Sequence, residues 1–169
     1  LRSLPRHRGE GRLGPARLAH CMRWTGVAQR ALDLATERAR SREAFGGPLA
    51  DKQAIQWMLA DSAMELYASR LMVLHSAWLI ETGQNYRQEV SFAKVYIAEA
   101  LNHIVDRAMQ IFGSLGYSKD LPIEQWYRDA RAARIYDGAS EVHRMVIARH
   151  VLRASQKFGT TKSATGRLA

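Results

Sequence analysis

One stretch of this 169-residue chain combines residue types and spacing that suit proton chemistry. A helix-forming segment from Arg128 ends at a Tyr136-Asp137-Gly138 break, and Ser140 is placed to cap the helix that follows. A carboxylate at a break between two helices can point into the space beyond their ends. Asp137 is therefore a candidate general base, although aspartate is also common in turns of purely structural origin.

Two further stretches suit the binding of a phosphate-bearing ligand. Arg42-Glu-Ala-Phe45-Gly46 precedes Gln53 near a predicted helix start, where a guanidinium group makes a good diphosphate site. The stretch 110–117 ends a helix with two glycines, which let backbone amides approach a phosphate closely. Each stretch also has a simpler interpretation, as an exposed arginine beside a phenylalanine plug and as a glycine helix cap.

In this order and spacing, from Arg17 to Arg149, these stretches resemble the C-terminal helical domain of the acyl-CoA dehydrogenases, a family of flavoenzymes. The resemblance implies that Asp137 removes the α-proton of an acyl-CoA thioester while a hydride passes to FAD. It also implies a homodimer or homotetramer, and an electron acceptor such as electron-transfer flavoprotein. The family's two preceding domains are missing from this sequence. We therefore expect these 169 residues to be inactive on their own.

The resemblance implies a set of flavin contacts. The family's arginine pairs with the flavin pyrophosphate, and its glycine-rich stretch binds the ADP part of the flavin held by a neighbouring subunit. Ser114, Ala139 and Glu141 differ from the glycine, threonine and glutamine common in the family, so those contacts are altered. The implied cofactor residues are Arg42, Phe45, Gln53, Gln110, Gly113, Ser114, Ala139 and Glu141.

The substrate contacts implied by the resemblance lie at both ends of the stretch that it covers. The implied residues are Arg17, Tyr136, Gly138 and Arg149. Some relatives carry their base near the start of the first helix instead, but Ala16 stands there and cannot act as a base. By this comparison the base must be Asp137.

The identity of the base points to one branch of the family. Most members use glutamate, which is one methylene longer than Asp137, whereas nitroalkane oxidase and the acyl-CoA dehydrogenase family members ten and eleven use aspartate. His20-Cys-Met-Arg23, together with Asp137-Gly and Glu141-Val-His143, is most similar to the ten and eleven branch.

The elements that position these residues are all predicted to be helices. Apolar residues at spacings of three and four predict a helix from Gly14-Pro15 to about residue 40, and a second from an Asp51 cap to Gly83. A third follows Asn85, residues 113–121 form a loop, and two shorter helices begin at Pro122 and Ser140, the latter running to about Lys157. The apolar face predicted to be buried includes Met22 in the first helix and Ala63 in the second.

The prediction is an all-α, antiparallel bundle of three long helices plus a helical hairpin. Residues 1–13 are predicted to be a lead-in from a missing upstream domain, 14–157 the bundle and 158–169 a flexible tail.

Composition narrows the remaining function classes. The net charge is +9, concentrated in residues 1–42, but no nucleic-acid-binding motif accompanies it. Cys21 is the single cysteine and is predicted to be a core residue, and the histidines show no metal-ligand spacing. No membrane span or secretion signal is recognised, so we expect a bacterial cytoplasm or an organelle matrix.

Two alternatives stay open. One is a non-catalytic oligomerisation module derived from the same family, and the other is a flavoenzyme resembling nitroalkane oxidase. The sequence does not identify the acyl chain.

Overall fold

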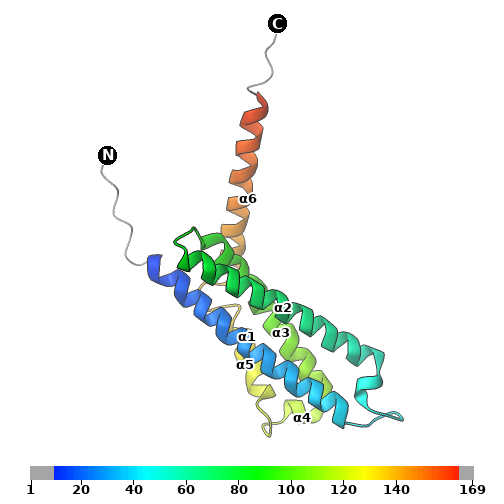
Figure 1. Ribbon diagram of the computed structural model, residues 1–169. Coiled ribbons are helices and arrows are strands. Elements are labelled where there is room, and N and C mark those ends of the chain that lie inside the picture. The colour runs from blue at the N-terminus through cyan, green and yellow to red at the C-terminus, as the bar shows by residue number, and fades with distance from the viewer. Residues whose placement is uncertain (1–9, 164–169) are drawn as a thin grey trace.

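The computed structural model describes residues 10–163, and within them the side chains of 13–155, as a bundle of helices (Figure 1). The elements are α1 (Glu10–Ser41), a 3-10 turn (Leu49–Asp51), α2 (Gln53–Glu81), α3 (Arg87–Phe112), α4 (Ser114–Tyr117), α5 (Ile123–Ala132) and α6 (Ser140–Ser163). In the described residues the only β-type pairing is an isolated bridge between Glu43 and Pro48. The predicted all-α fold is confirmed.

Helix α3 is the centre of the bundle, because α1, α2, α4, α5 and α6 all pack against it. Its apolar residues point both toward α1 and toward α2, so most of its circumference is buried; the fully or nearly fully buried ones are Val90, Ala93, Ile97, Ala98, Ala100, Leu101, Ile104, Val105, Ala108 and Ile111. A helix that is apolar on most sides is expected at the centre of a domain.

Side-chain pairs give the directions of the long helices. Arg107 of α3 forms an ion pair with Glu65 of α2, and Arg38 of α1 lies over the Phe112 ring at the end of α3. Helices α1 and α3 therefore run parallel, with α2 antiparallel to both. Helix α6 projects away from this layer (Figure 1), and among the described residues α5 and α6 pack on α3 and not on each other.

The inner face of α1 consists largely of small residues. Ala28, Ala31, Ala35 and Ala39 are buried, which lets the α1 backbone approach α3 closely. Cys21 is completely buried on the same face, and burial raises the pKa of its thiol to about 12. A thiol with so little thiolate is unreactive, which agrees with a core role. Met22, predicted to be in the core, is 56% exposed because it lies one residue round the helix from Cys21.

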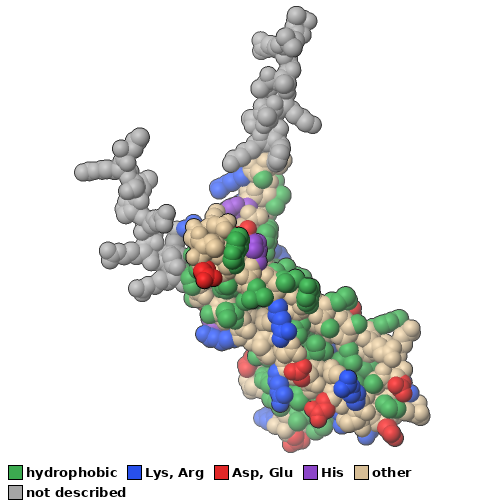
Figure 2. All heavy atoms as spheres, in the orientation of Figure 1, with side chains coloured by type: hydrophobic (Ala, Val, Ile, Leu, Met, Phe, Trp, Pro, Cys, Tyr) green, Lys and Arg blue, Asp and Glu red, His purple; other side chains and the backbone are tan. Residues whose placement is uncertain are grey.

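Helix α2 is apolar on two sides, whereas its sequence pattern was interpreted as a single apolar stripe. Its inner side is lined by Ser62, Leu66, Ser69, Val73 and Ser76, whereas Ala63, predicted to be buried, is exposed. Its outer side carries large apolar residues that follow one another at spacings of seven, three, four, three and four: Trp57, Met64, Tyr67, Leu71, Leu74 and Trp78, each at least 49% exposed. We call these six residues the α2 seam. Hydrophobic side chains are visible along this exposed part of the bundle in Figure 2.

Some predicted boundaries were wrong. Helix α1 begins at Glu10 rather than at Gly14-Pro15, so Pro15 lies inside the helix, where it lacks one backbone hydrogen bond. Asp51 does not cap α2: it ends the 3-10 turn, and Lys52 occupies the cap position without a side-chain hydrogen bond. The predicted 113–121 loop contains the short helix α4, and α6 continues past Lys157 to Ser163. Gly83, with φ 69°, follows the end of α2 as predicted.

Candidate functional site

The turn between α5 and α6 holds Asp137 in an unusual backbone conformation. Its φ is 55°, in the left-handed region that residues with a side chain seldom adopt. The Asp137 carbonyl accepts a hydrogen bond of 2.9 Å from Nε of Arg17 on α1, so this predicted substrate residue supports the turn. Gly138 follows with φ 97°, and a Cβ at this position would lie 2.8 Å from Nε2 of His143.

Three side chains of α3 form hydrogen bonds to the residues on either side of this turn. The fully buried Lys94 ammonium donates a 2.7 Å hydrogen bond to the carbonyl of Ala133, and Asn102 donates one of 2.8 Å to that of Ala130. Ser91 Oγ lies 3.1 Å from Nδ1 of His143 on α6. Because His143 is almost fully buried, the pKa of its imidazole is lowered, which favours the neutral ring. Both ends of the turn are thus fixed to one rigid helix.

The Asp137 side chain is paired with His20. Its Oδ2 lies 2.7 Å from Nε2 of His20, with side-chain exposures of 33% and 27%. The His20 ring packs against Trp24 and Tyr136, with ring centroids 5.9 and 5.4 Å away. Tyr136, a predicted substrate residue, accepts a 2.9 Å hydrogen bond from the indole N–H of Trp24 at its hydroxyl. An imidazole and two aromatic rings therefore surround one side of the carboxylate.

The Arg42 stretch forms a second strained turn, between α1 and α2. The Ala44 N–H donates to the Gly47 carbonyl, and Phe45 and Gly46 at the tip have φ of 53° and 83°. Two consecutive positive φ values are typical of a tight two-residue hairpin turn. The Phe45 side chain is 95% exposed, so it is not the plug that the simpler interpretation proposed.

The glycine-rich stretch lies at the same end of the bundle. Arg38 Cζ is 5.6 Å from the Phe112 ring centroid, which brings the ends of α1 and α3 together. Gly113, with φ 65°, ends α3, and Gln110 and Ser114 beside it are exposed. Gly116 has a packing role instead, since a Cβ there would lie 2.9 Å from the Met109 carbonyl.

The predicted site residues therefore form two groups. Arg17, Tyr136, Asp137, Gly138 and Ala139 lie around the α5–α6 turn, and Glu141 is exposed in the first turn of α6. Arg42, Phe45, Gln53, Gln110, Gly113 and Ser114 lie at the far end of the bundle. Along α1, the 22 residues from His20 to Arg42 span about 33 Å at 1.5 Å per residue. Arg149 is exposed on α6 beyond both groups.

The second group has the chemistry that a dinucleotide requires. It offers a guanidinium group, an exposed aromatic ring and two exposed side-chain amides, at converging helix ends. Among the described residues, no hydrogen bond or ion pair occupies the Arg42 side chain. These residues fit the phosphates and adenine of a flavin adenine dinucleotide.

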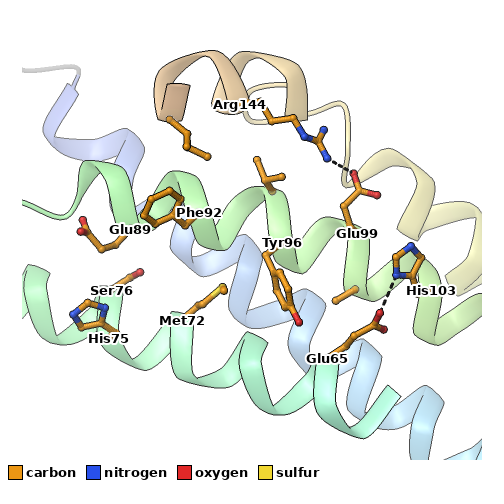
Figure 3. A pocket seen from close by; sticks show the side chains of 13 residues that line it. Glu65, Met72, His75, Ser76, Glu89, Phe92, Tyr96, Glu99, His103 and Arg144 are labelled. Carbon is orange, nitrogen blue, oxygen red and sulfur yellow. Dashed lines mark hydrogen bonds and ion pairs between the residues drawn. The ribbon is translucent and has the colours of Figure 1, made fainter. Parts of the chain in front are cut away.

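Two grooves lie away from Asp137. One, of about 470 Å³, runs between α2, α3 and the start of α6; it has mostly apolar walls, with the pairs Glu65–His103 and Glu99–Arg144 at its edge (Figure 3). None of its lining residues was predicted to be in a site. The other, of about 1010 Å³, lies between α3 and α5 and is bordered by Gln110 and several arginines. Neither groove is an acyl pocket beside Asp137.

Sequence reasoning did not assign His20, Trp24, Lys94 or His143 to the site. His20 and Trp24 follow Arg17 at spacings of three and four, so the helical period could have placed all three on one face of α1. No comparable signal marks Lys94. In the sequence it is a typical charged residue of an amphipathic helix, and only the packing of α1 and the α5–α6 turn buries it.

No helix in the described part of the chain is long and apolar enough to cross a membrane. Likewise, within residues 10–163 no group of three or more histidine, cysteine or acidic side chains could hold a metal ion.

Comparison with known proteins adds independent findings. The family model described as "Acyl-CoA dehydrogenase, C-terminal domain" matches residues 8–152. The mitochondrial short-chain specific acyl-CoA dehydrogenase of Bos taurus is 44% identical over 144 residues, covering 85% of this chain and 34% of the relative. Acyl-CoA dehydrogenase family member 10 of Mus musculus is 40% identical over 151 residues, covering 88% of this chain and 14% of the relative.

A solved structure shows the same fold. Butyryl-CoA dehydrogenase from Megasphaera elsdenii superposes with a TM-score of 0.80 and 33% sequence identity, covering 83% of this chain and 37% of that one. The chain thus spans about a third of the length of the short-chain enzyme and of the butyryl-CoA enzyme. The match to family member 10 agrees with the predicted branch, and the identity to the short-chain enzyme is similarly high.

The tight packing of the α5–α6 turn leads to a prediction about its glycine. Gly138→Ala should lower the free energy of unfolding by about 1–3 kcal/mol, because it adds a methyl group against His143 at a positive φ. Gly26→Ala is the matched control: no atom lies within 4 Å of the added carbon in α1, so it should stabilise by about 0.5–1 kcal/mol. Urea unfolding followed by circular dichroism measures both, and equal effects of the two changes would contradict this account of the turn.

Proposed function

The chain belongs to the acyl-CoA dehydrogenase family as its C-terminal domain, and from this membership we propose that Asp137 is the base of a flavin-dependent acyl-CoA dehydrogenase. One observation carries the proposal. Among the described residues, the only non-glycine residues with positive φ are Phe45 and Asp137, which the sequence analysis had selected independently for cofactor and substrate chemistry. Backbone strain of this kind persists where the surrounding structure enforces it, and it is concentrated at functional sites.

In the proposed reaction Asp137 takes the α-proton of the acyl-CoA thioester. FAD, when bound, supplies the acceptor for the β-hydride. Among the described residues the Asp137 N–H has no acceptor, so it is free to donate to the thioester carbonyl and stabilise the charge that develops there. Arg17 supports this by holding the Asp137 carbonyl on the other side of the residue.

The proposed cofactor site combines two copies of the chain. A separation of about 33 Å between the two groups of residues is longer than an extended flavin adenine dinucleotide. A flavin ring beside Asp137 of one copy would therefore have its phosphates held by the Arg42 and Gln110 end of another. Such an exchange is reciprocal in a symmetric dimer. The proposed partners are thus the acyl-CoA substrate, a second or further copies, and an electron acceptor such as electron-transfer flavoprotein.

The α2 seam supports assembly. Its six large apolar side chains cover about 31 Å of helix, at 1.5 Å per residue, on the spacing that lets one helix pack along another. Exposed apolar surfaces of this extent mark interaction sites. We assign the seam to contact between copies, and we assign the complete reaction to the whole protein of which these residues form one domain.

The role of Asp137 is tested in the intact gene product by anaerobic addition of saturated acyl-CoAs of several chain lengths. Substrate should bleach the visible flavin band, and Asp137→Asn should slow bleaching by about 100- to 10 000-fold, the usual contribution of a general base. Asp137→Glu, which restores the length common in the family, should keep more activity than the asparagine variant. Asp129→Asn, an exposed change in α5, is the control. An oligomer that binds no flavin even after reconstitution would support the oligomerisation module instead.

The cofactor role of the Arg42 turn predicts a selective loss of flavin. Arg42→Gln should weaken FAD binding by about 10- to 100-fold, because a charge-assisted hydrogen bond contributes roughly 1.5–3 kcal/mol. Arg40→Gln removes another exposed arginine two residues earlier and should leave binding unchanged. Flavin dissociation constants from fluorescence titration of the apoprotein measure both. Equal losses in the two variants would indicate a general charge effect.

The role of the α2 seam in assembly is tested by introducing charged side chains into it. Leu71→Glu with Leu74→Glu should dissociate the oligomer at micromolar concentration, because two carboxylates would be buried in an apolar contact. Met22→Glu, on the exposed side of α1, is the control. Light scattering after gel filtration gives the mass of each variant. If the double variant remains an intact oligomer, the seam does not form the contact between copies and packs against another part of the protein instead.

A further inference from the structure

The Asp137 carboxylate needs a specific support, because it is shorter than the base common in its family. A side chain with rotatable χ1 and χ2 torsions populates several orientations unless its surroundings select one. Proton abstraction requires an oxygen within hydrogen-bond reach of the carbon acid, and a misplacement of about 1 Å can cost roughly 100-fold in rate. The turn fixes the Asp137 backbone, but the carboxylate itself extends beyond it.

His20 is placed to give that support. Its Nε2 lies 2.7 Å from Oδ2 of Asp137, a distance typical of a charge-assisted hydrogen bond. Among the described residues no hydrogen bond or ion pair reaches Oδ1 of Asp137. One oxygen is therefore held while the other is free to receive a proton.

The imidazole is itself held in place. Its ring packs against both Trp24 and Tyr136, whose rings lie 5.6 Å apart and are joined by the hydrogen bond from the indole N–H to the phenol oxygen. Trp24 is buried and has the Lys94 ammonium 5.0 Å from its ring. The chain of contacts runs from the centre of the bundle to the carboxylate, so His20 has little freedom to move away.

We propose that His20 is a positioning residue, which donates its Nε2–H to Oδ2 of Asp137 and so fixes the carboxylate with Oδ1 toward the substrate. This inference rests on the proposed role of Asp137 as the base. The function of His20 is to donate a hydrogen bond, and it accepts no proton from Asp137 during the reaction.

The test uses the full-length flavoprotein and two substitutions, one that keeps a hydrogen-bond donor and one that removes it. In His20→Gln the amide nitrogen lies the same number of bonds from Cα as Nε2 of histidine, so the donor is kept but proton acceptance is lost. His20→Leu removes the donor. The leucine variant should bleach at saturating acyl-CoA about 10- to 100-fold more slowly with an unchanged half-saturating acyl-CoA concentration, and the glutamine variant should recover to within about threefold of wild type. His75→Leu, an exposed histidine on α2, should have no effect.

Either of two kinetic results would overturn the proposal. Wild-type rates in His20→Leu would show that the contact is dispensable. Equal slowing in the leucine and glutamine variants would show that hydrogen-bond donation is not the function of the imidazole. If His20→Leu does not fold, His20→Met takes its place, since it has similar length and no donor.

Crystal structures give a readout that does not depend on activity. The Asp137 carboxylate should have one orientation in the wild-type holoenzyme and in His20→Gln, and several in His20→Leu. A single unchanged orientation in the leucine variant would contradict positioning by His20. If wild type does not bleach with any acyl-CoA, the proposed function fails, whereas the structural comparison still decides whether His20 orders the carboxylate.

Discussion

The buried ammonium of Lys94 is the interaction on which the rest of this arrangement depends. It is fully inaccessible, donates to the Ala133 carbonyl and lies over the Trp24 ring, so a single charge joins α3, α1 and the end of α5. Removal from water lowers the pKa of this lysine, which reflects the cost of burying a cation. Such a charge is tolerated only where carbonyl and aromatic partners compensate for its lost hydration.

That anchor explains how a strained turn persists. The hydrogen bonds from α3 to Ala133, Ala130 and His143 fix both sides of the α5–α6 turn without involving Asp137 itself. The left-handed conformation of Asp137 is then imposed by its surroundings, at a typical cost of about 1–3 kcal/mol. As a result, the Asp137 carboxylate and its backbone amide are presented together by one turn.

How much of this was predictable depends on the range of the interactions. Helix periods in the sequence identified α1, α2 and α3, and the break at Asp137 marked the turn, because both are local properties of the chain. The exact helix starts were less predictable, since Pro15 and Asp51 carry start signals that the packed helices override. The second apolar side of α2 was also missed, because a single inward stripe was assumed for a helix that is apolar on two sides.

Residue types at fixed short spacings were enough to predict the all-α class, the candidate base and the turn that carries Asp137. Tertiary structure alone decided that His20 pairs with Asp137, 117 positions away, and that Lys94 is buried rather than solvated. It also placed the predicted cofactor residues and the proposed base near opposite ends of α1. Those outcomes depend on which helices pack together, and a one-dimensional pattern records which face of a helix is apolar but not which neighbour covers it.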